Sequence, residues 1–134
     1  MVVVDSSVWI TSFRGKDAEI VARLRAMLDD GEVALAVPVR IELLSGASAR
    51  DLPRLRRVLS ALPLLRVEEA TWQQIDRWIE QAVKAGDRFG LGDLLIAATA
   101  ALHGCRVWSL DSDFARMAAL GWIEIHTWET KRAV

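Results

Sequence analysis

The sequence is poor in the residues that mark several special classes of protein. Its only cysteine, Cys105, excludes an internal disulfide and a zinc site of the paired-cysteine type. Three prolines and eight glycines in 134 residues are too few for a collagen-like or low-complexity chain. A hydrophobic fraction of 52% is too high for a disordered one. These absences leave a folded globular protein, and the single cysteine favours a reducing, cytoplasmic compartment.

Long apolar runs and a strong net charge are also missing. The longest apolar stretch, residues 94–102, has nine residues including Thr99, whereas a membrane span needs about twenty. The first residues carry no basic segment of the kind that opens a secretory signal, so we expect no membrane association. The net charge of −1 does not indicate nucleic-acid binding. Arginine nevertheless outnumbers lysine by fourteen to three, and its planar fork suits phosphate.

Short apolar runs alternate with amphipathic stretches along the chain. Strands are expected at residues 2–4, 33–37, 107–110 and 122–126, and helices at 18–30, from 38 onward, at 53–62, 72–83, 94–102 and 114–120. This order predicts an α/β fold with a mostly parallel central sheet flanked by helices on both faces. The length predicts one domain over residues 1–134. We expect the tail after Trp128 to fray.

Acidic residues stand where the predicted sheet would bring them together. Asp5 follows the first strand, Asp111 follows a later one, and Asp113 lies two residues further on. Glu42 lies among apolar residues of a helix that follows a strand, and Asp93 opens the most apolar helix. Because open parallel sheets bind ligands at the carboxyl ends of their strands, we expect these acids to converge on one rim.

Each acid also has an ordinary structural interpretation. Asp5 suits a turn at the end of a strand, and Asp93 suits a helix N-cap. Asp111 and Asp113 suit the cap of a following helix, and Glu42 suits a solvent-exposed face. These roles are common for any single acid and stay open, but the joint placement of all five on one rim favours a shared site.

A pocket of unpaired carboxylates raises the pKa of its members and destabilises the fold. A divalent cation relieves this repulsion, and oxygen ligands without histidine or cysteine select a hard ion, Mg²⁺ or Mn²⁺, over zinc. Such ions lower the pKa of an attacking water and stabilise a leaving oxygen. The chemistry that fits this pattern is phosphodiester hydrolysis.

Four segments that carry these acids resemble, in order and spacing, the motifs of PIN-domain ribonucleases. The segments are residues 3–10, 38–46, 93–100 and 107–114. At this compact size, the chain most resembles the VapC toxins of toxin–antitoxin pairs. The resemblance implies an endoribonuclease that depends on Mg²⁺ or Mn²⁺, forms a homodimer and is inhibited by a VapB-type antitoxin. It also implies that the antitoxin lies on the helices between residues 53 and 86.

Matched residue by residue, the resemblance places Asp5, Glu42, Asp93 and Asp111 in the family's acidic quartet, with Asp113 as a frequent fifth acid whose contact is often indirect. As a hypothesis, Asp5, Asp93 and Asp111 hold the metal, with Asp113 beside them. Glu42 then ligates through water or orients the attacking water.

Hydroxyls and arginines complete the predicted site. Ser6 offers a hydroxyl beside the first acid, and Ser109 stands where the family usually has threonine or serine. The candidate RNA-binding residues are Arg14, Arg50, Arg54 and Arg88. They suit RNA phosphates, and they suit solvated helix faces equally well.

The six tryptophans are divided between core and surface. We expect Trp9, Trp72, Trp78 and Trp108 in the core, and we assign Trp122 and Trp128 to a dimer surface. Base stacking is the less favoured interpretation.

Other functions fit the sequence less well. A phosphoacceptor receiver domain expects a lysine after a late strand, and the only lysines are Lys16, Lys84 and Lys131. A haloacid-dehalogenase phosphatase places its nucleophile after an early strand, whereas Asp111 lies near the end of the chain. The remaining alternative is a non-catalytic PIN-like domain that binds RNA or acts as a scaffold. A metal titration of RNA cleavage distinguishes it from the enzyme.

Overall fold

The computed structural model describes residues 1–127 and contains a four-stranded parallel sheet of order β3-β2-β1-β4. The strands are β1 (Val2–Val4), β2 (Val33–Ala36), β3 (Leu64–Leu65) and β4 (Arg106–Trp108). Every residue of β1 and β2 is buried. Continuous apolar runs of this kind are typical of parallel strands that are covered on both faces.

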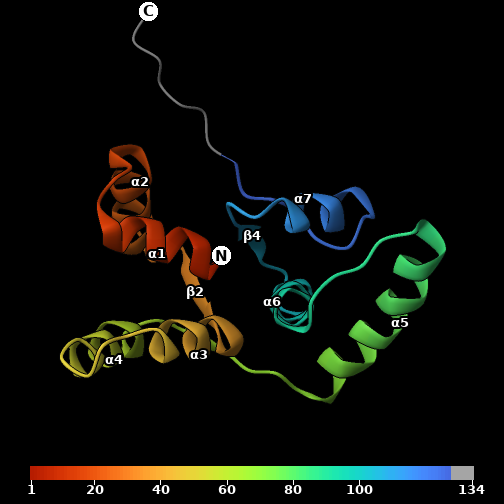
Figure 1. The fold of residues 1–134 in the computed structure, drawn as a ribbon, viewed down its shortest axis with the longest axis horizontal. Helices are drawn as coiled ribbons and strands as arrows, with labels where there is room; N and C mark the ends of the chain where they lie inside the picture. The colour runs from red at the N-terminus through yellow and green to blue at the C-terminus, as the bar shows by residue number, and fades with distance from the viewer. Residues whose placement is uncertain (128–134) are drawn as a thin grey trace, which may run out of the picture.

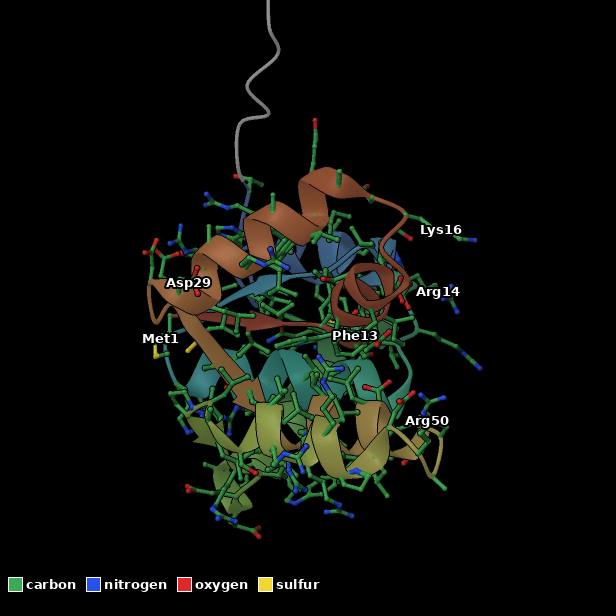
Figure 2. The ribbon with its side chains drawn as sticks, turned by 90° about the vertical axis from the view of Figure 1, so that its left-hand side faces the viewer. Met1, Phe13, Arg14, Lys16, Asp29 and Arg50 are labelled. Carbon is green, nitrogen blue, oxygen red and sulfur yellow. The ribbon has the colours of Figure 1, made fainter. Side chains whose placement is uncertain are left out.

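Helices cover both faces of the sheet, as the sequence predicts. They are α1 (Ser6–Arg14), α2 (Ala18–Asp29), α3 (Val37–Ser45), α4 (Leu52–Ser60), α5 (Glu69–Ala85), α6 (Leu91–Leu102) and α7 (Ser112–Ala119). Figures 1 and 2 show α1, α2 and α7 on one side of the sheet, and α3, α4 and α6 on the other. The long helix α5 packs against α6 at the outside.

The most apolar helix, α6, lies at the centre of the fold. All its residues from Ile96 to Ala100 are buried, and it contacts β1, β2 and β4. The helix begins at Leu91, three residues earlier than its apolar run suggests, because Gly90 occupies the N-cap position. Asp93 therefore lies inside the first turn rather than at the cap.

The order of the strands sets the position of the functional rim. From β1 the chain builds outward through β2 to β3, and it then returns to the other side of β1 as β4. The direction of winding thus reverses between β1 and β4, which is where open α/β sheets place ligands. The register pairs Val4 with Trp108. Asp5 and Ser109, the residues that follow these two strands, therefore become neighbours.

Several elements differ from the sequence prediction. Residues 6–14 form α1 directly after β1, whereas the sequence predicts a turn at Asp5 and no helix there. The strand expected at residues 122–126 is reduced to a single parallel bridge between Val107 and Ile125. The edge strand β3 has only two residues, one exposed and one half-buried, which is too short to show a strand pattern in the sequence.

Two tryptophan assignments are wrong. Trp72 is 48% exposed on α5, because the buried side of that helix is formed instead by Ile75, Trp78 and Ala82. Trp122 is buried rather than on a surface, and its ring stacks on Trp78 at 4.7 Å between centroids. The predictions for Trp128 and the tail lie outside the described residues. Within residues 1–127, no helix has the length and hydropathy needed to cross a membrane.

Candidate active site

Asp5 is the most deeply buried acid at the rim. Its backbone N–H donates to the carbonyl of Trp108 at 2.8 Å, which extends the pairing of β1 with β4 by one residue. Its side chain is only 4% exposed, and Oδ2 accepts hydrogen bonds from Ser7 Oγ and Ser109 Oγ, each at 2.7 Å. These two hydroxyls hold the carboxylate in one orientation and satisfy its charge in a buried place.

The same two hydroxyls also bind the loop that follows β4. Ser7 Oγ accepts from the backbone N–H of Leu110 at 3.1 Å, and Ser109 Oγ accepts from that of Asp111 at 3.0 Å. Asp5 is thereby linked through serine hydroxyls to the backbone that carries Asp111. The first turn of α1 and the loop before α7 are thus locked together.

Glu42 reaches the rim from α3. Ser6 Oγ lies 3.3 Å from Glu42 Oε2 and 3.5 Å from Asp5 Oδ1, so one hydroxyl stands between the two carboxylates. Partial burial raises the pKa of Glu42, and the negative charge of Asp5 raises it further, while the Ser6 hydrogen bond acts in the opposite direction. Glu42 is therefore an acid whose proton is held more tightly than usual, beside a fixed carboxylate.

Three further carboxylates at the rim form a tight group. Asp93, in the first turn of α6, and Asp111 and Asp113, at the start of α7, each offer an oxygen, and these oxygens all lie within 4.8 Å of one another. Asp111 occupies the N-cap position of α7, and its Oδ1 accepts from the backbone N–H of Asp113 at 2.9 Å. Asp111 can therefore cap α7 and also belong to the acidic site.

The electrostatics of this group are unusual for surface acids. Burial raises the pKa of Asp93 from 3.8 to about 7, assisted by a hydrogen bond with Asp113 and by the charges of Asp111, Asp5 and Asp113. The pKa of Asp113 is lowered, chiefly by its hydrogen bond from Arg116. Asp93 is therefore the acid of the pair that binds a proton more tightly. A carboxyl whose pKa is raised toward neutral by burial and by neighbouring carboxylates indicates an excess of negative charge that a cation would relieve.

The structure brings the five predicted acids together at one rim. The four predicted arginines do not form one group, because Arg88 lies apart from the other three. The acids converge from the end of β1, from α3, from the first turn of α6 and from the start of α7, although Asp5 and Glu42 lie outside the tight group of three. Arg14 and Arg54 line a groove that Glu42 also lines. Arg88 lies in the loop before α6, where its backbone carbonyl accepts from Arg116 at 3.4 Å.

The groove has a volume of about 710 Å³ and runs between α1, α3 and α4. Its lining is largely apolar, with Ile10, Phe13 and Val58 partly exposed to solvent. Figure 2 shows Phe13 and Arg14 at the end of α1, with Arg50, in the segment before α4, on the same side of the molecule. Glu42 is the residue that the groove shares with the acidic rim.

Sequence reasoning missed two residues of the site. Ser7 makes shorter contacts with Asp5 than Ser6 does, but the sequence offers no reason to prefer one of two adjacent serines. Arg116 forms ion pairs with Asp87 at 2.8 Å and with Asp113 at 2.6 Å. Its spacing of three residues from Asp113 on one helix was the available signal.

Known proteins share both the sequence pattern and the fold. The PIN-domain family model matches residues 2–120. Ribonuclease VapC11 of Mycobacterium tuberculosis is 31% identical over 125 residues, which cover 90% of this chain and 93% of that protein.

Solved structures agree with this match. The crystal structure of FitAcB from Neisseria gonorrhoeae has a TM-score of 0.79 at 21% identity and covers 95% of this chain and 97% of its own. That of VapBC2 from Rickettsia felis, bound to a DNA fragment from its promoter, has a TM-score of 0.77 at 16% identity, with 96% and 100% covered.

The parallel sheet of order β3-β2-β1-β4, with helices on both faces, is therefore the PIN fold. The chain belongs to the PIN-domain family and, within it, to the VapC ribonuclease toxins of VapBC toxin–antitoxin systems.

Proposed function

We propose that the protein is an endoribonuclease toxin that hydrolyses RNA phosphodiester bonds with Mg²⁺ or Mn²⁺ held by the acidic rim. The observation that carries the proposal is the group formed by Asp93, Asp111 and Asp113, whose oxygens lie within 4.8 Å of one another beside the buried Asp5. Membership of the VapC family supports the ribonuclease activity, since the relative VapC11 is named a ribonuclease.

The residues at the rim fit a hard divalent cation. The donors are carboxylate and hydroxyl oxygens, which Mg²⁺ and Mn²⁺ prefer. The raised pKa of Asp93 supports the same conclusion, because a cation would replace the proton that the cluster now shares. In this proposal Asp5, Asp93 and Asp111 hold the ion, and Asp113 lies next to it. When bound, the ion polarises a phosphate oxygen and lowers the pKa of a nearby water.

The chain's own residues then orient the reactants. The hydroxyls of Ser7 and Ser109 fix Asp5, so the carboxylate cannot rotate away from the rim. Glu42, with its raised pKa, orients the attacking water through Oε2 and accepts its proton. The water oxygen bonds to phosphorus as the P–O bond to the leaving ribose oxygen breaks, and a proton from solvent water completes the leaving hydroxyl.

We infer that RNA approaches along the groove that leads to Glu42. Arg14 and Arg54 line this groove and offer guanidinium groups to RNA phosphates. Arg50, in the segment before α4, is exposed on the same side of the molecule as Arg14 (Figure 2), whereas Arg88 is exposed in the loop before α6. Arg14→Gln together with Arg54→Gln is expected to raise KM and to flatten the salt dependence of cleavage, and an unchanged salt slope would remove both residues from the RNA path.

We also propose that a VapB-type antitoxin occupies the same groove. Structural neighbours such as the Rickettsia felis protein are VapBC assemblies, and the partly exposed Ile10, Phe13 and Val58 suit an apolar helix face. The groove uses α4 but not α5 of the helices that the resemblance implied for the antitoxin. Val58→Asp is expected to prevent neutralisation by the cognate antitoxin while cleavage continues, and full neutralisation would place the antitoxin elsewhere.

A homodimer, as the family resemblance implies, remains part of the proposal. The outer face of α5 presents Trp72, Ile79 and Val83, at helical spacing and 48%, 46% and 72% exposed. Light scattering is expected to give twice the chain mass for the wild type, and half that mass for Ile79→Glu. A wild-type monomer would remove the dimer from the account.

The experiment that tests the function uses purified, antitoxin-free protein and total RNA. Cleavage is measured with Mg²⁺, with Mn²⁺ and with EDTA, and the cut ends are mapped. We expect cuts at a few sites that require metal and are lost in Asp5→Asn, while Asp76→Asn, an exposed aspartate on α5, cuts normally. Metal-dependent cutting by a folded Asp5→Asn protein would contradict the assignment. An absence of cutting with either metal would favour a non-catalytic RNA-binding domain.

A further inference from the structure

Arg116 on α7 connects the loop that precedes Asp93 with Asp113, an acid of the proposed site. Its Nη1 donates to Asp87 Oδ1 at 2.8 Å, and its Nη2 donates to Asp113 Oδ1 at 2.6 Å. A longer bond of 3.4 Å runs from Nη2 to the carbonyl of Arg88. Asp87, Arg116 and Asp113 are called the arginine clamp below.

The two ends of the clamp lie far apart in the sequence. Asp87 lies in the short loop between α5 and α6, six residues before Asp93, and Asp113 lies in the first turn of α7. The clamp therefore ties the segment that leads into Asp93 to the helix that begins at Asp111.

The Arg116 guanidinium lies against a group of packed aromatic rings. The Arg116 guanidinium carbon lies 4.6 Å from the centre of the Phe89 ring. Phe89 meets Trp122 edge-on at 5.4 Å, and Trp122 lies parallel to Trp78 at 4.7 Å. The Trp122 indole N–H donates to Gln81 Oε1 at 2.6 Å. A planar guanidinium with one face on a fixed ring and two carboxylates at its edge has little freedom to rotate.

The clamp fixes the positions of side chains more than it adds to the free energy of unfolding. The Arg116 side chain is 42% exposed, and ion pairs open to solvent contribute little to the free energy of unfolding. The three clustered carboxylates, however, repel one another within 4.8 Å. Without Arg116, Asp113 would keep its hydrogen bond with Asp93, but the loop before α6 and the first turn of α7 would lose their direct connection.

We propose that Arg116 is a positioning residue that sets the separation of Asp93 from Asp111 and Asp113 by tying Asp87 to Asp113. The proposal rests on the function proposed above, since these acids are its metal site. Arg116 itself touches neither metal nor substrate in this account. It acts as outer-shell partners of metal ligands do, whose loss typically costs about 10- to 100-fold in metal affinity or activity.

The test measures Mn²⁺ binding by calorimetry and RNA cleavage kinetics in the wild type and four variants. Arg116→Met removes the clamp while keeping length, and Asp87→Asn removes only its outer end. Arg77→Met is the matched control, because Arg77 is exposed on α5 and bonds to Gln74 within the same helix. We expect Arg116→Met and Asp87→Asn each to raise the Mn²⁺ Kd about 10-fold and to lower kcat, with KM within about 2-fold of wild type.

The sign of the Arg116→Met effect discriminates between mechanisms. Removing a positive charge beside the site would by itself tighten cation binding, so weaker binding follows only from lost positioning. The double variant Arg116→Met/Asp87→Asn is expected to be no worse than Arg116→Met alone, because both changes disable one clamp.

Several results would overturn the inference. Unchanged or tighter Mn²⁺ binding in Arg116→Met would mean that Arg116 only offsets the negative charge of the acids and does not position them. A raised KM with an unchanged Mn²⁺ Kd would make Arg116 an RNA contact, and a lowered Tm with an unchanged Kd would make its role structural. If the wild type neither binds Mn²⁺ nor cuts RNA, the proposed function fails and the inference fails with it. If the wild type does both and the variants match it, the inference alone fails.

Discussion

Replacing Asp93 with asparagine should stabilise the metal-free protein at alkaline pH. The pKa of Asp93 is raised from 3.8 to about 7, so between those values the folded protein holds a proton that the unfolded chain has released. Stability contributed by this group is therefore lost as pH rises from about 4 to 7. The full change corresponds to roughly 4 kcal/mol. Water screens this half-buried group, so we expect on the order of 1–2 kcal/mol.

Urea denaturation at pH 5 and pH 8, with EDTA, tests this prediction. At pH 8 the Asp93→Asn protein should be more stable than the wild type, and at pH 5 the difference should be smaller. Saturating Mg²⁺ should reverse the order at pH 8, because only the wild type gains from binding the ion. Asp76→Asn serves as the control. An equal stability difference at both pH values, or a less stable variant at pH 8 with EDTA, would refute the reasoning.

Two further predictions concern residues that support the site. Ser109→Ala removes one of the 2.7 Å bonds to Asp5 and should cost about 1–2 kcal/mol in urea denaturation, with a clear loss of cleavage rate; Ser109→Thr should restore both, and normal cleavage by the alanine variant would make the hydroxyl dispensable. Trp122→Ala removes the buried ring between Phe89 and Trp78 and should cost about 3–5 kcal/mol. A calorimetric loss below about 1 kcal/mol would show that the stack contributes little.

The sequence predicts most of the sheet and the convergence of the acids. Buried parallel strands such as β1 and β2 are continuous apolar runs, and the acids that follow strands must share a rim once the sheet is parallel. Helix α1 escapes prediction because only Ser6, Val8 and Trp9 of its nine residues are buried, which is too short a stripe to show a period.

Finer features of the site depend on contacts between distant segments. Ser7 and Ser109 lie 102 residues apart, and their Oγ atoms are 3.3 Å apart only because β1 pairs with β4 in one register. Arg116 reaches Asp87 across 29 residues, through a loop whose path the sequence does not reveal. Exposure of Trp72 likewise depends on which side of α5 meets α6. Such features require the fold itself.

We propose above that the acidic rim holds the divalent ion of a ribonuclease. The most direct measurement is an anomalous difference map from a crystal of the wild-type protein grown with Mn²⁺. We predict a peak bounded by the carboxylates of Asp5, Asp93 and Asp111, and no peak there in Asp5→Asn. A rim without a peak, in crystals of protein that cuts RNA in the same Mn²⁺ buffer, would contradict the account.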